Sequence, residues 1–218
     1  MFNRKYNSRK PYKKIYIFTE GIKTEVNYFE SKRKEIEQEI RRKNITIKIT
    51  GMGKNTISLF NFVINFINEQ NIDLNTDECW IVFDKDNYNA NFDGAINKAL
   101  AKGLKVAYSN ACFELWYLLH FCYMDSAIDQ KEYPQKLTDH LRNSAGDKKI
   151  EYSKNSENIY FLIKDKESDA IKNAKKLLST YGNKKSFSKN NPSTTVHLLV
   201  ENLNNLKTQG KIVPGFIF

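Results

Sequence analysis

The sequence lacks any long apolar run, and this absence argues against a membrane-spanning protein. Its richest apolar stretch, Cys112 to Met124, is interrupted by Glu114 and His120. The stretch is also shorter than the about 18 apolar residues that a transmembrane helix requires. Residues 1–5 (Met-Phe-Asn-Arg-Lys) lack the apolar centre of a signal peptide. We therefore expect a cytoplasmic protein without membrane contact.

Cysteine is scarce as well. The three cysteines, Cys79, Cys112 and Cys122, are odd in number, lie in apolar runs and show no zinc-type pairing. Such residues are typical of buried free thiols in a reducing compartment. The length of 218 residues and the hydrophobic content of 40% predict one sizeable core, with room for a small appended lobe.

Acidic residues are absent from residues 1–14, which hold six basic side chains and so more than half of the net charge of +10. A second basic stretch, residues 164–189, carries eight lysines against three acids. Aromatic residues are interleaved with both stretches, as in surfaces that bind phosphodiester backbones. Solvated lysines in a lysine- and asparagine-rich chain explain the same pattern, so charge alone leaves nucleic-acid binding open.

Alternating strands and helices are expected over residues 1–124. Short apolar or alternating segments predict strands at 15–18, 45–49, 79–83 and 104–108. Apolar residues at helical spacing predict helices at 24–43, 57–70, 93–102 and 112–124. This alternation favours an α/β fold with a parallel sheet covered on both faces. Right-handed crossovers and a switch point between the first and third strands favour the strand order 2-1-3-4.

Three carboxylates follow two of these strands. Glu20 comes just after the first predicted strand, and Asp84 and Asp86 come just after the third. In the order 2-1-3-4 these strands are neighbours, so the side chains gather at the carboxyl edge, where open parallel sheets bind ligands. Their hard oxygen atoms suit Mg²⁺ or Mn²⁺. Capping of a helix or stabilisation of a turn is the alternative role of each acid.

The pattern changes after Met124. Strand signals fade, and helices are expected at 134–143, 168–181 and 194–206, with a break at Asn191-Pro192-Ser193. We divide the chain into three parts on this basis. They are a core at residues 1–124, a mostly helical basic insertion at 125–190, and a C-terminal helix and tail at 191–218 that pack on the core.

Four motifs follow one another along the chain. They are Phe18-Thr19-Glu20-Gly21-Ile22-Lys23-Thr24-Glu25-Val26-Asn27-Tyr28-Phe29, Val82-Phe83-Asp84-Lys85-Asp86, Tyr108-Ser109-Asn110-Ala111-Cys112-Phe113-Glu114-Leu115-Trp116 and Asn191-Pro192-Ser193-Thr194-Thr195-Val196. Their residues and order resemble the motifs of the RloB-like family, which is encoded in restriction and phage-defence islands. The resemblance spans most of the chain and is weakest at residues 125–190.

The resemblance implies a fold and a metal site. The RloB-like family is similar to Toprim domains, so it implies a Toprim-like, Rossmannoid four-stranded parallel sheet covered by helices, with a helical C-terminal appendage. Glu20 matches the Toprim glutamate, and Asp84 and Asp86 match its Asp-x-Asp pair. By resemblance, all three are catalytic residues that bind Mg²⁺ or Mn²⁺. Glu20 acts either as a ligand or as a general base, and the sequence does not choose between these roles.

Two further acids are candidate catalytic residues. Glu25 lies near the start of the first helix, where an acid also suits the helix dipole. Glu114 has apolar neighbours in the sequence, and a buried carboxylate requires a cation, a hydrogen-bond donor or a metal. Ser109 and Asn110 are expected to cap a helix or to contact phosphate. The expected nucleic-acid contacts are Gly21, Lys23, Asn110, Lys184, Lys185 and Lys189.

Other chemistries have less support in the sequence. His120, His140 and His197 lack metal-ligand spacing, and His120 is expected to be a core residue of the aromatic helix. The turn at residues 51–56, Gly-Met-Gly-Lys-Asn-Thr, lacks the G-x-x-x-x-G-K-[ST] spacing of a phosphate loop.

We therefore expect a metal-dependent nuclease that cleaves phosphodiester bonds of DNA or RNA, tRNA included. The resemblance adds a role as an effector of antiphage defence, with an AAA-type ATPase as partner. The alternative is a non-catalytic module that binds nucleic acid or an ATPase and keeps the fold. Nucleotidyl transfer, as in primases, is a third interpretation, but no separate nucleotide-binding motif in the sequence supports it. The sequence leaves the oligomeric state open, a homo-oligomer included.

Overall fold

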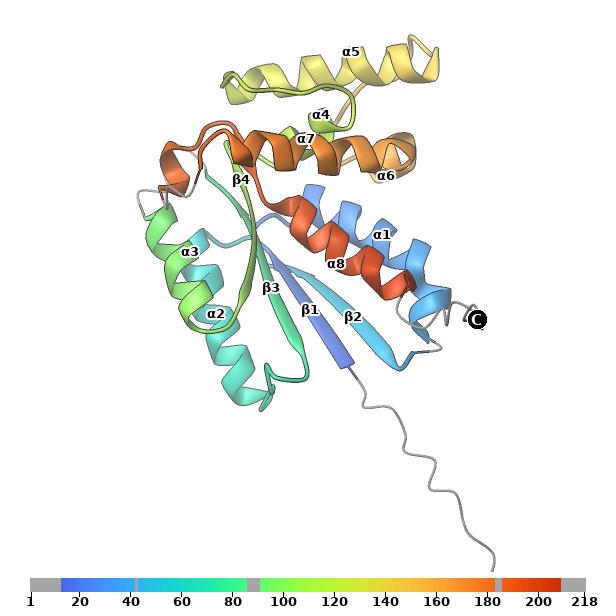
Figure 1. The fold of residues 1–218 in the computed structure, drawn as a ribbon. Helices are drawn as coiled ribbons and strands as arrows, with labels where there is room; N and C mark the ends of the chain where they lie inside the picture. Colours follow the sequence, from blue (N-terminus) through green and yellow to red (C-terminus); the bar gives the residue numbers. More distant parts are fainter. Residues whose placement is uncertain (1–12, 42, 86–90, 183–185, 209–218) are drawn as a thin grey trace, which may run out of the picture.

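A five-stranded sheet forms the centre of the molecule (Figure 1). The computed structural model describes residues 13–41, 43–85, 91–182 and 186–208. The strands are β1 (Lys13–Thr19), β2 (Ile45–Gly51), β3 (Glu78–Asp84), β4 (Lys105–Asn110) and β5 (Ser193–Thr194). Their order is β2-β1-β3-β4-β5, and the first four strands are parallel. The predicted order 2-1-3-4 and the α/β class are therefore confirmed, and the sheet is Rossmann-like.

Helices cover both faces of the sheet. The covering helices are α1 (Thr24–Arg41), α2 (Thr56–Glu69), α3 (Phe92–Ala101) and α8 (Val196–Thr208). Figure 1 shows α2 and α3 on one face and α1 with α8 on the other. No helix in the described ranges combines the length and the apolar character that a membrane crossing requires.

Strand side chains alternate between two hydrophobic clusters, one on each face. In β1, Ile15 and Ile17 join the cluster that contains α1 and α8, whereas Tyr16 and Phe18 join the cluster that contains α2 and α3. A parallel strand that is buried on both faces is apolar at nearly every position. This burial explains why the strands are short continuous apolar runs in the sequence.

A third group of helices lies beyond the carboxyl ends of the strands (Figure 1). It consists of α4 (Glu114–Leu119), α5 (Tyr133–Ala145), α6 (Ile159–Ile163) and α7 (Glu167–Ser179). Leu137 of α5 and Ala174 of α7 belong to the same hydrophobic cluster as Ile17 of β1 and Phe29 of α1. Much of the predicted insertion therefore completes the core that the sheet begins.

The apolar helix predicted at 112–124 is shorter than expected. Helix α4 ends at Leu119, and the chain has no regular structure from Cys122 to Ser126 except a bend. A run in which nearly every residue is apolar has no alternation of apolar and polar positions, so hydrophobic periodicity cannot show where a helix within it ends. The packing of Tyr123 and Met124 against the core explains their apolar character without a helix.

Strand β5 was not predicted from the sequence. It pairs antiparallel with β4, where Thr194 lies opposite Ser109. Beside it, the hydroxyl of Thr195 accepts a hydrogen bond of 2.9 Å from the backbone N–H of Tyr108. The strand consists of two small polar residues, which form no hydrophobic pattern. A strand of this kind therefore cannot be predicted from its own sequence.

Candidate active site

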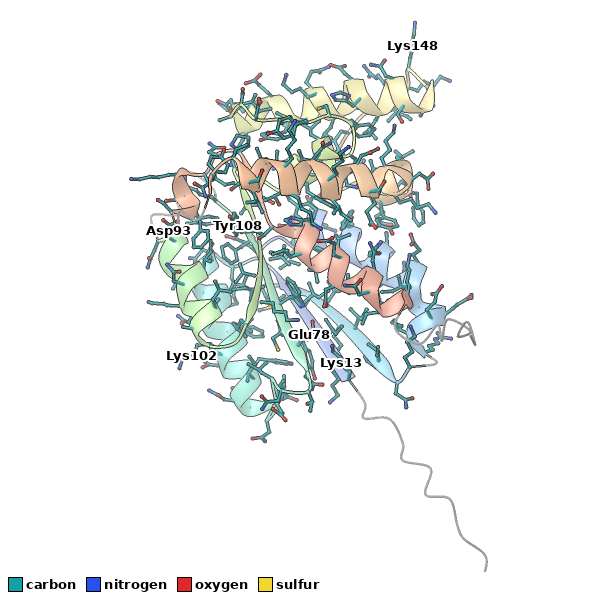
Figure 2. The ribbon with its side chains drawn as sticks, viewed as in Figure 1. Lys13, Glu78, Asp93, Lys102, Tyr108 and Lys148 are labelled. Atoms are coloured by element: carbon teal, nitrogen blue, oxygen red, sulfur yellow. The ribbon has the colours of Figure 1, made fainter. Side chains whose placement is uncertain are left out.

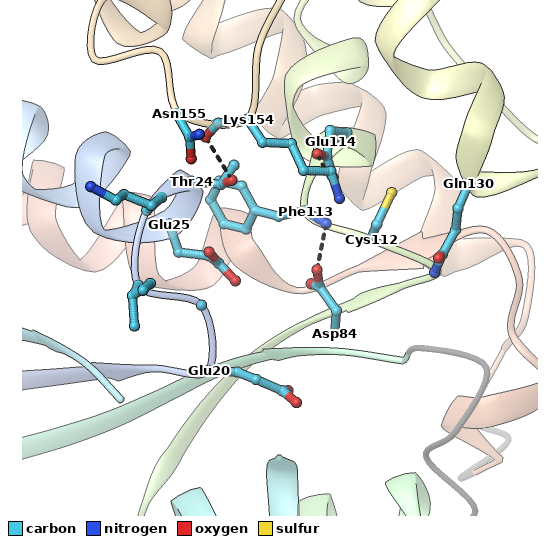
Figure 3. Close-up of a pocket in the computed structure, with 13 residues that line it drawn as sticks. Glu20, Thr24, Glu25, Asp84, Cys112, Phe113, Glu114, Gln130, Lys154 and Asn155 are labelled. Atoms are coloured by element: carbon cyan, nitrogen blue, oxygen red, sulfur yellow. Dashed lines mark hydrogen bonds and ion pairs between the residues drawn. The ribbon is translucent and has the colours of Figure 1, made fainter. Parts of the chain in front are cut away.

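The carboxyl edge of the sheet carries the candidate active site. Glu20 follows β1, and Asp84 is the last residue of β3. The two strands are paired in parallel, with Thr19 opposite Val82, so these acids lie at the same edge as predicted. A cavity of about 350 Å³ opens there and is lined by four carboxylates and two lysines (Figure 3). These residues are Glu20, Glu25, Asp84, Glu114, Lys23 and Lys154.

Asp84 is half-buried as a residue, and one of its carboxylate oxygens is fully enclosed. Its Oδ2 accepts a hydrogen bond of 2.9 Å from the backbone N–H of Phe113. Its Oδ1 is buried without a hydrogen-bond partner among the described residues. Burial raises the pKa of Asp84 well above its ordinary value, and the charges of Glu25, Glu114 and Glu20 raise it further. The native fold therefore holds this carboxylate where its charged form is poorly stabilised.

Glu25 projects from the first turn of α1 toward Asp84 (Figure 3). Its side chain is 6% exposed, and burial raises its pKa. Hydrogen bonds with the backbone of Glu25 itself and of Gly21 lower that pKa in part, and the charge of Glu114 raises it. Two buried acids with raised pKa values thus face one cavity, an arrangement that is enriched in functional sites.

Gly21 is required by the close approach of Glu25. A Cβ atom at position 21 would lie 2.2 Å from Oε2 of Glu25 and 2.8 Å from its carboxyl carbon. Real Cβ atoms do not come so near to other atoms, so any larger residue at this position displaces the carboxylate. The sequence prediction placed Gly21 near phosphate, and the structure places it on the cavity wall against Glu25.

We expect Gly21→Ala to lower the free energy of unfolding by about 1 kcal/mol, the low end of the cost of overpacking, because the displaced atoms are the end of one side chain. The cause is the clash with the Glu25 carboxylate, so the effect should largely disappear in the Glu25→Ala background. Urea unfolding of the wild type, both single variants and the double variant measures this coupling. Additive effects of the two substitutions would contradict the assigned contact.

Glu20 is held by the start of the second helix. Its Oε2 accepts a hydrogen bond of 3.1 Å from the hydroxyl of Thr56, the first residue of α2. Thr56 is buried, and Asn55 caps the same helix by accepting from the backbone N–H of Ser58. The turn that resembled a phosphate loop therefore ends in a residue that orients Glu20.

Glu114 is paired with two groups from a distant loop. Its Oε1 accepts a hydrogen bond of 2.9 Å from the hydroxyl of Tyr152 and lies 3.5 Å from Nζ of Lys154. Glu114 is only 3% exposed, yet it lines the cavity. The carboxylate raises the pKa of Lys154. A buried Glu114 was expected to need a hydrogen-bond donor or a cation beside it, and the structure shows Tyr152 as the donor and Lys154 as the cation.

Comparison with known protein families gives a match to the RloB-like protein family over residues 15–203. The chain belongs to this family. The match runs from β1 into α8 and confirms the resemblance of the four motifs. No curated protein and no solved structure matches the chain.

The RloB-like fold brings some of the predicted nucleic-acid contacts to the cavity and leaves others away from it. Gly21 and Lys23 line the cavity. Lys189 is exposed in the segment before β5 and does not line the cavity. Three further predicted residues, Asp86, Lys184 and Lys185, lie outside the described residues.

Asn110 has a structural role in the RloB-like chain rather than the predicted contact with phosphate. Its side chain is buried, and Nδ2 donates to the backbone carbonyls of Phe187, Ser188 and Asn190. The Asn110 amide thus fixes the segment that leads into β5. Asn110 is not among the residues that line the cavity. Ser109 is likewise buried, within hydrogen-bond distance of Thr194.

His120 is a core residue, as the sequence predicted, and no histidine lines the described part of the cavity. His120 is buried, and its Nδ1 lies 2.9 Å from the carbonyl of Trp116. Burial lowers the pKa of His120 to about 4, so it is neutral at physiological pH. It is a core residue of the aromatic cluster.

The cavity also contains residues that the sequence prediction missed. Lys154 and Asn155 come from the loop between α5 and α6, and Gln130 comes from the segment before α5. They lie in the polar region where the motif resemblance was weakest. No local pattern distinguishes them from solvated loop residues, so only the fold identifies them.

The residues around Asp84 supply part of what a divalent-cation site needs. Within the described ranges, no three His, Cys, Asp or Glu side chains lie close enough to form a complete ligand set. Asp86, the third predicted ligand, is outside those ranges. The donors that are present are hard oxygen atoms, and Oδ1 of Asp84 is buried without a described partner. A cation at this point would offset both the missing hydrogen bond and the repulsion among the carboxylates.

Proposed function

We propose that this RloB-like protein is a Mg²⁺- or Mn²⁺-dependent nuclease that cleaves phosphodiester bonds of DNA or RNA. The observation that carries the proposal is the buried Asp84 carboxylate, which faces a solvent-reachable cavity together with Glu20, Glu25 and Glu114. Burying like charges together costs stability. Such a cost is typical of sites whose charges act on a ligand.

Glu20 and Asp84 are the residues that would hold the metal, with Asp86 added from its motif. When bound, the metal would stabilise charge on phosphoryl oxygens and lower the pKa of a water molecule. The protein itself orients the two carboxylates that would bind the metal. The N–H of Phe113 fixes the Asp84 carboxylate, and the hydroxyl of Thr56 fixes that of Glu20. Glu25 is the acid best placed beside them to accept a proton, because its charged form is disfavoured by burial.

The alternative is a module that binds nucleic acid or an ATPase without catalysis. Such a module attracts phosphate with basic groups, and four acids in the binding cavity weaken that attraction. The cavity is net negative when its four carboxylates and two lysines are ionised. It therefore suits a phosphate that arrives together with a metal better than a phosphate alone.

Membership of the RloB-like family supports a biological role for this activity. We propose that the nuclease is an effector of antiphage defence and that an AAA-type ATPase is its partner. Cleavage of tRNA is one form of the activity that suits such an effector. These proposals rest on the family resemblance, whereas the proposed chemistry rests on the cavity.

Cleavage of plasmid DNA, total RNA and tRNA in Mg²⁺, Mn²⁺ or EDTA tests the proposal. The assay is run with and without any AAA-type ATPase encoded beside the gene. We expect cleavage that requires metal and that Glu20→Gln reduces by about 100-fold or more. Glu69→Gln, on the exposed far end of α2, is the matched control with full activity. Binding without cleavage under every condition would favour the non-catalytic module.

A further inference from the structure

The loop between α5 and α6 brings a cation to the candidate site. The backbone carbonyl of Lys154 accepts a hydrogen bond of 3.0 Å from the hydroxyl of Thr24. The carbonyl of Asn155 accepts one of 3.4 Å from the side chain of Asn27. Both donors lie in the first turns of α1, next to the carboxylates. The loop backbone is therefore tied to the wall of the cavity.

The far side of the loop is anchored as well. The backbone N–H of Tyr152 donates to the hydroxyl of Thr138 in α5, and the carbonyl of Ile150 accepts from Nε of Arg142. The Tyr152 hydroxyl then binds Glu114. These contacts hold the loop without the Lys154 side chain, so the position of the loop does not depend on that ammonium group.

The Lys154 side chain extends across the cavity and ends beside Glu114 (Figure 3). Its Nζ is 3.5 Å from Oε1 of Glu114, longer than the about 2.7–2.9 Å of a strong charge-assisted hydrogen bond. The Lys154 side chain is 67% exposed, so water screens its attraction to the buried Glu114 carboxylate. An ammonium group that is loosely paired and solvent-accessible retains donors for another anion.

We propose that Lys154 binds the phosphate of the nucleic acid that is to be cleaved and neutralises its charge during the reaction. This inference rests on the proposed nuclease function. Lys154 supplies positive charge in a cavity where, among the described residues, the other charged groups apart from Lys23 are carboxylates. Glu114 and Tyr152 act as positioning residues, because Glu114 holds the ammonium over the cavity and Tyr152 holds Glu114. A lysine suits this role as a compact point charge for phosphate.

Lys154→Met tests the inference, because it keeps the aliphatic stem and removes the charge. We expect kcat/KM to fall by about 10- to 100-fold, the effect of losing one charged hydrogen bond in the transition state. Lys154→Arg should restore part of the activity. The matched control is Lys148→Met in the same loop, which projects from the outer end of α5 (Figure 2) and should cleave like the wild type.

Binding measurements separate a substrate contact from a structural role. Anisotropy of a labelled oligonucleotide is recorded with Ca²⁺ over a range of salt concentrations. Lys154→Met should flatten the salt dependence by about 0.7–0.9 log units, as expected for one lost phosphate contact. The melting temperature and its rise with Mn²⁺ should stay close to the wild-type values. A large fall in melting temperature with an unchanged salt slope would overturn the inference in favour of a structural ion pair.

The outcomes distinguish this inference from the proposed function. If the wild type cleaves and Lys154→Met cleaves equally well, the inference is overturned and the nuclease function stands. If the wild type binds the oligonucleotide without cleaving it and Lys154→Met loses that binding, the phosphate contact stands and the nuclease function falls. If the wild type neither binds nor cleaves with any metal, both are overturned.

Discussion

Asp84→Asn is expected to abolish cleavage and to stabilise the metal-free protein at neutral pH. Asparagine keeps an oxygen for the N–H of Phe113 but removes the charge that binds the metal. Activity should fall by about 1,000-fold, as for groups that stabilise charge at a reacting centre. Stability should rise because the variant no longer buries a carboxylate among Glu25, Glu114 and Glu20. Single-turnover cleavage and thermal unfolding in EDTA measure the two effects.

Asp139→Asn is the matched control for this prediction. Asp139 is exposed on α5, where it accepts a hydrogen bond from Gln135 and does not line the cavity. The control should leave both cleavage and the metal-induced rise in melting temperature unchanged. If Asp84→Asn cleaves at the wild-type rate, Asp84 is not a residue of the active site. If Asp84→Asn is less stable than the wild type in EDTA, other groups of the folded protein stabilise the charge of Asp84.

The same carboxylates predict how stability depends on pH. The pKa values of Asp84 and Glu25 are raised in the native state, so between the unfolded and the native pKa the native state binds more protons. The stability that these two groups contribute to the metal-free protein is therefore complete below an unfolded pKa of about 4 and is lost as pH rises through the raised values. Added Mg²⁺ should raise the melting temperature more at about pH 8 than at about pH 5, because metal and protons compete.

Unfolding in urea and EDTA at several pH values tests this dependence. The decline with pH should be weaker in Asp84→Asn than in the wild type, because one of the two titrating groups is gone. Parallel curves for the two proteins would show that Asp84 keeps an ordinary pKa in the fold.

Lys32→Met is expected to lower the free energy of unfolding by about 3–5 kcal/mol, a large share of a domain's total stability. Lys32 is almost fully buried in α1, and its Nζ lies 2.8 and 2.7 Å from the two carboxylate oxygens of Glu167 in α7. Asn204 of α8 also donates to Glu167. Removal of the lysine leaves a largely buried carboxylate without its cation where three helices meet.

A second substitution separates lost charge pairing from lost packing. Lys32→Met with Glu167→Gln should recover most of the stability, because the glutamine is neutral and still accepts from Asn204. Lys34→Met, exposed on the same helix, is the matched control and should change stability by less than about 0.5 kcal/mol. Urea unfolding measures all three variants. A loss of less than about 1 kcal/mol in Lys32→Met would contradict the assigned burial of the pair.

The sequence by itself determined the four parallel strands of the sheet and the placement of two acids. Apolar runs that end in Glu20 and Asp84 predict two buried strands and the edge where these acids meet, because burial on both faces leaves a local apolar signal. The four motifs identified the family that the residue match confirms. Gly21 was predicted to lie near phosphate, and the structure shows it on the cavity wall against Glu25.

Only the tertiary structure decided which polar groups meet. Tyr152 reaches Glu114 across 38 residues, Thr24 reaches Lys154 across 130, and Lys32 reaches Glu167 across 135. Hydrophobic periodicity reports which face of a segment is buried, but it carries no information about which distant donor or charge lies opposite that face. For this reason Asn110 was predicted to contact phosphate but is a buried hydrogen-bond donor, whereas Lys154, which the sequence did not single out, lines the cavity.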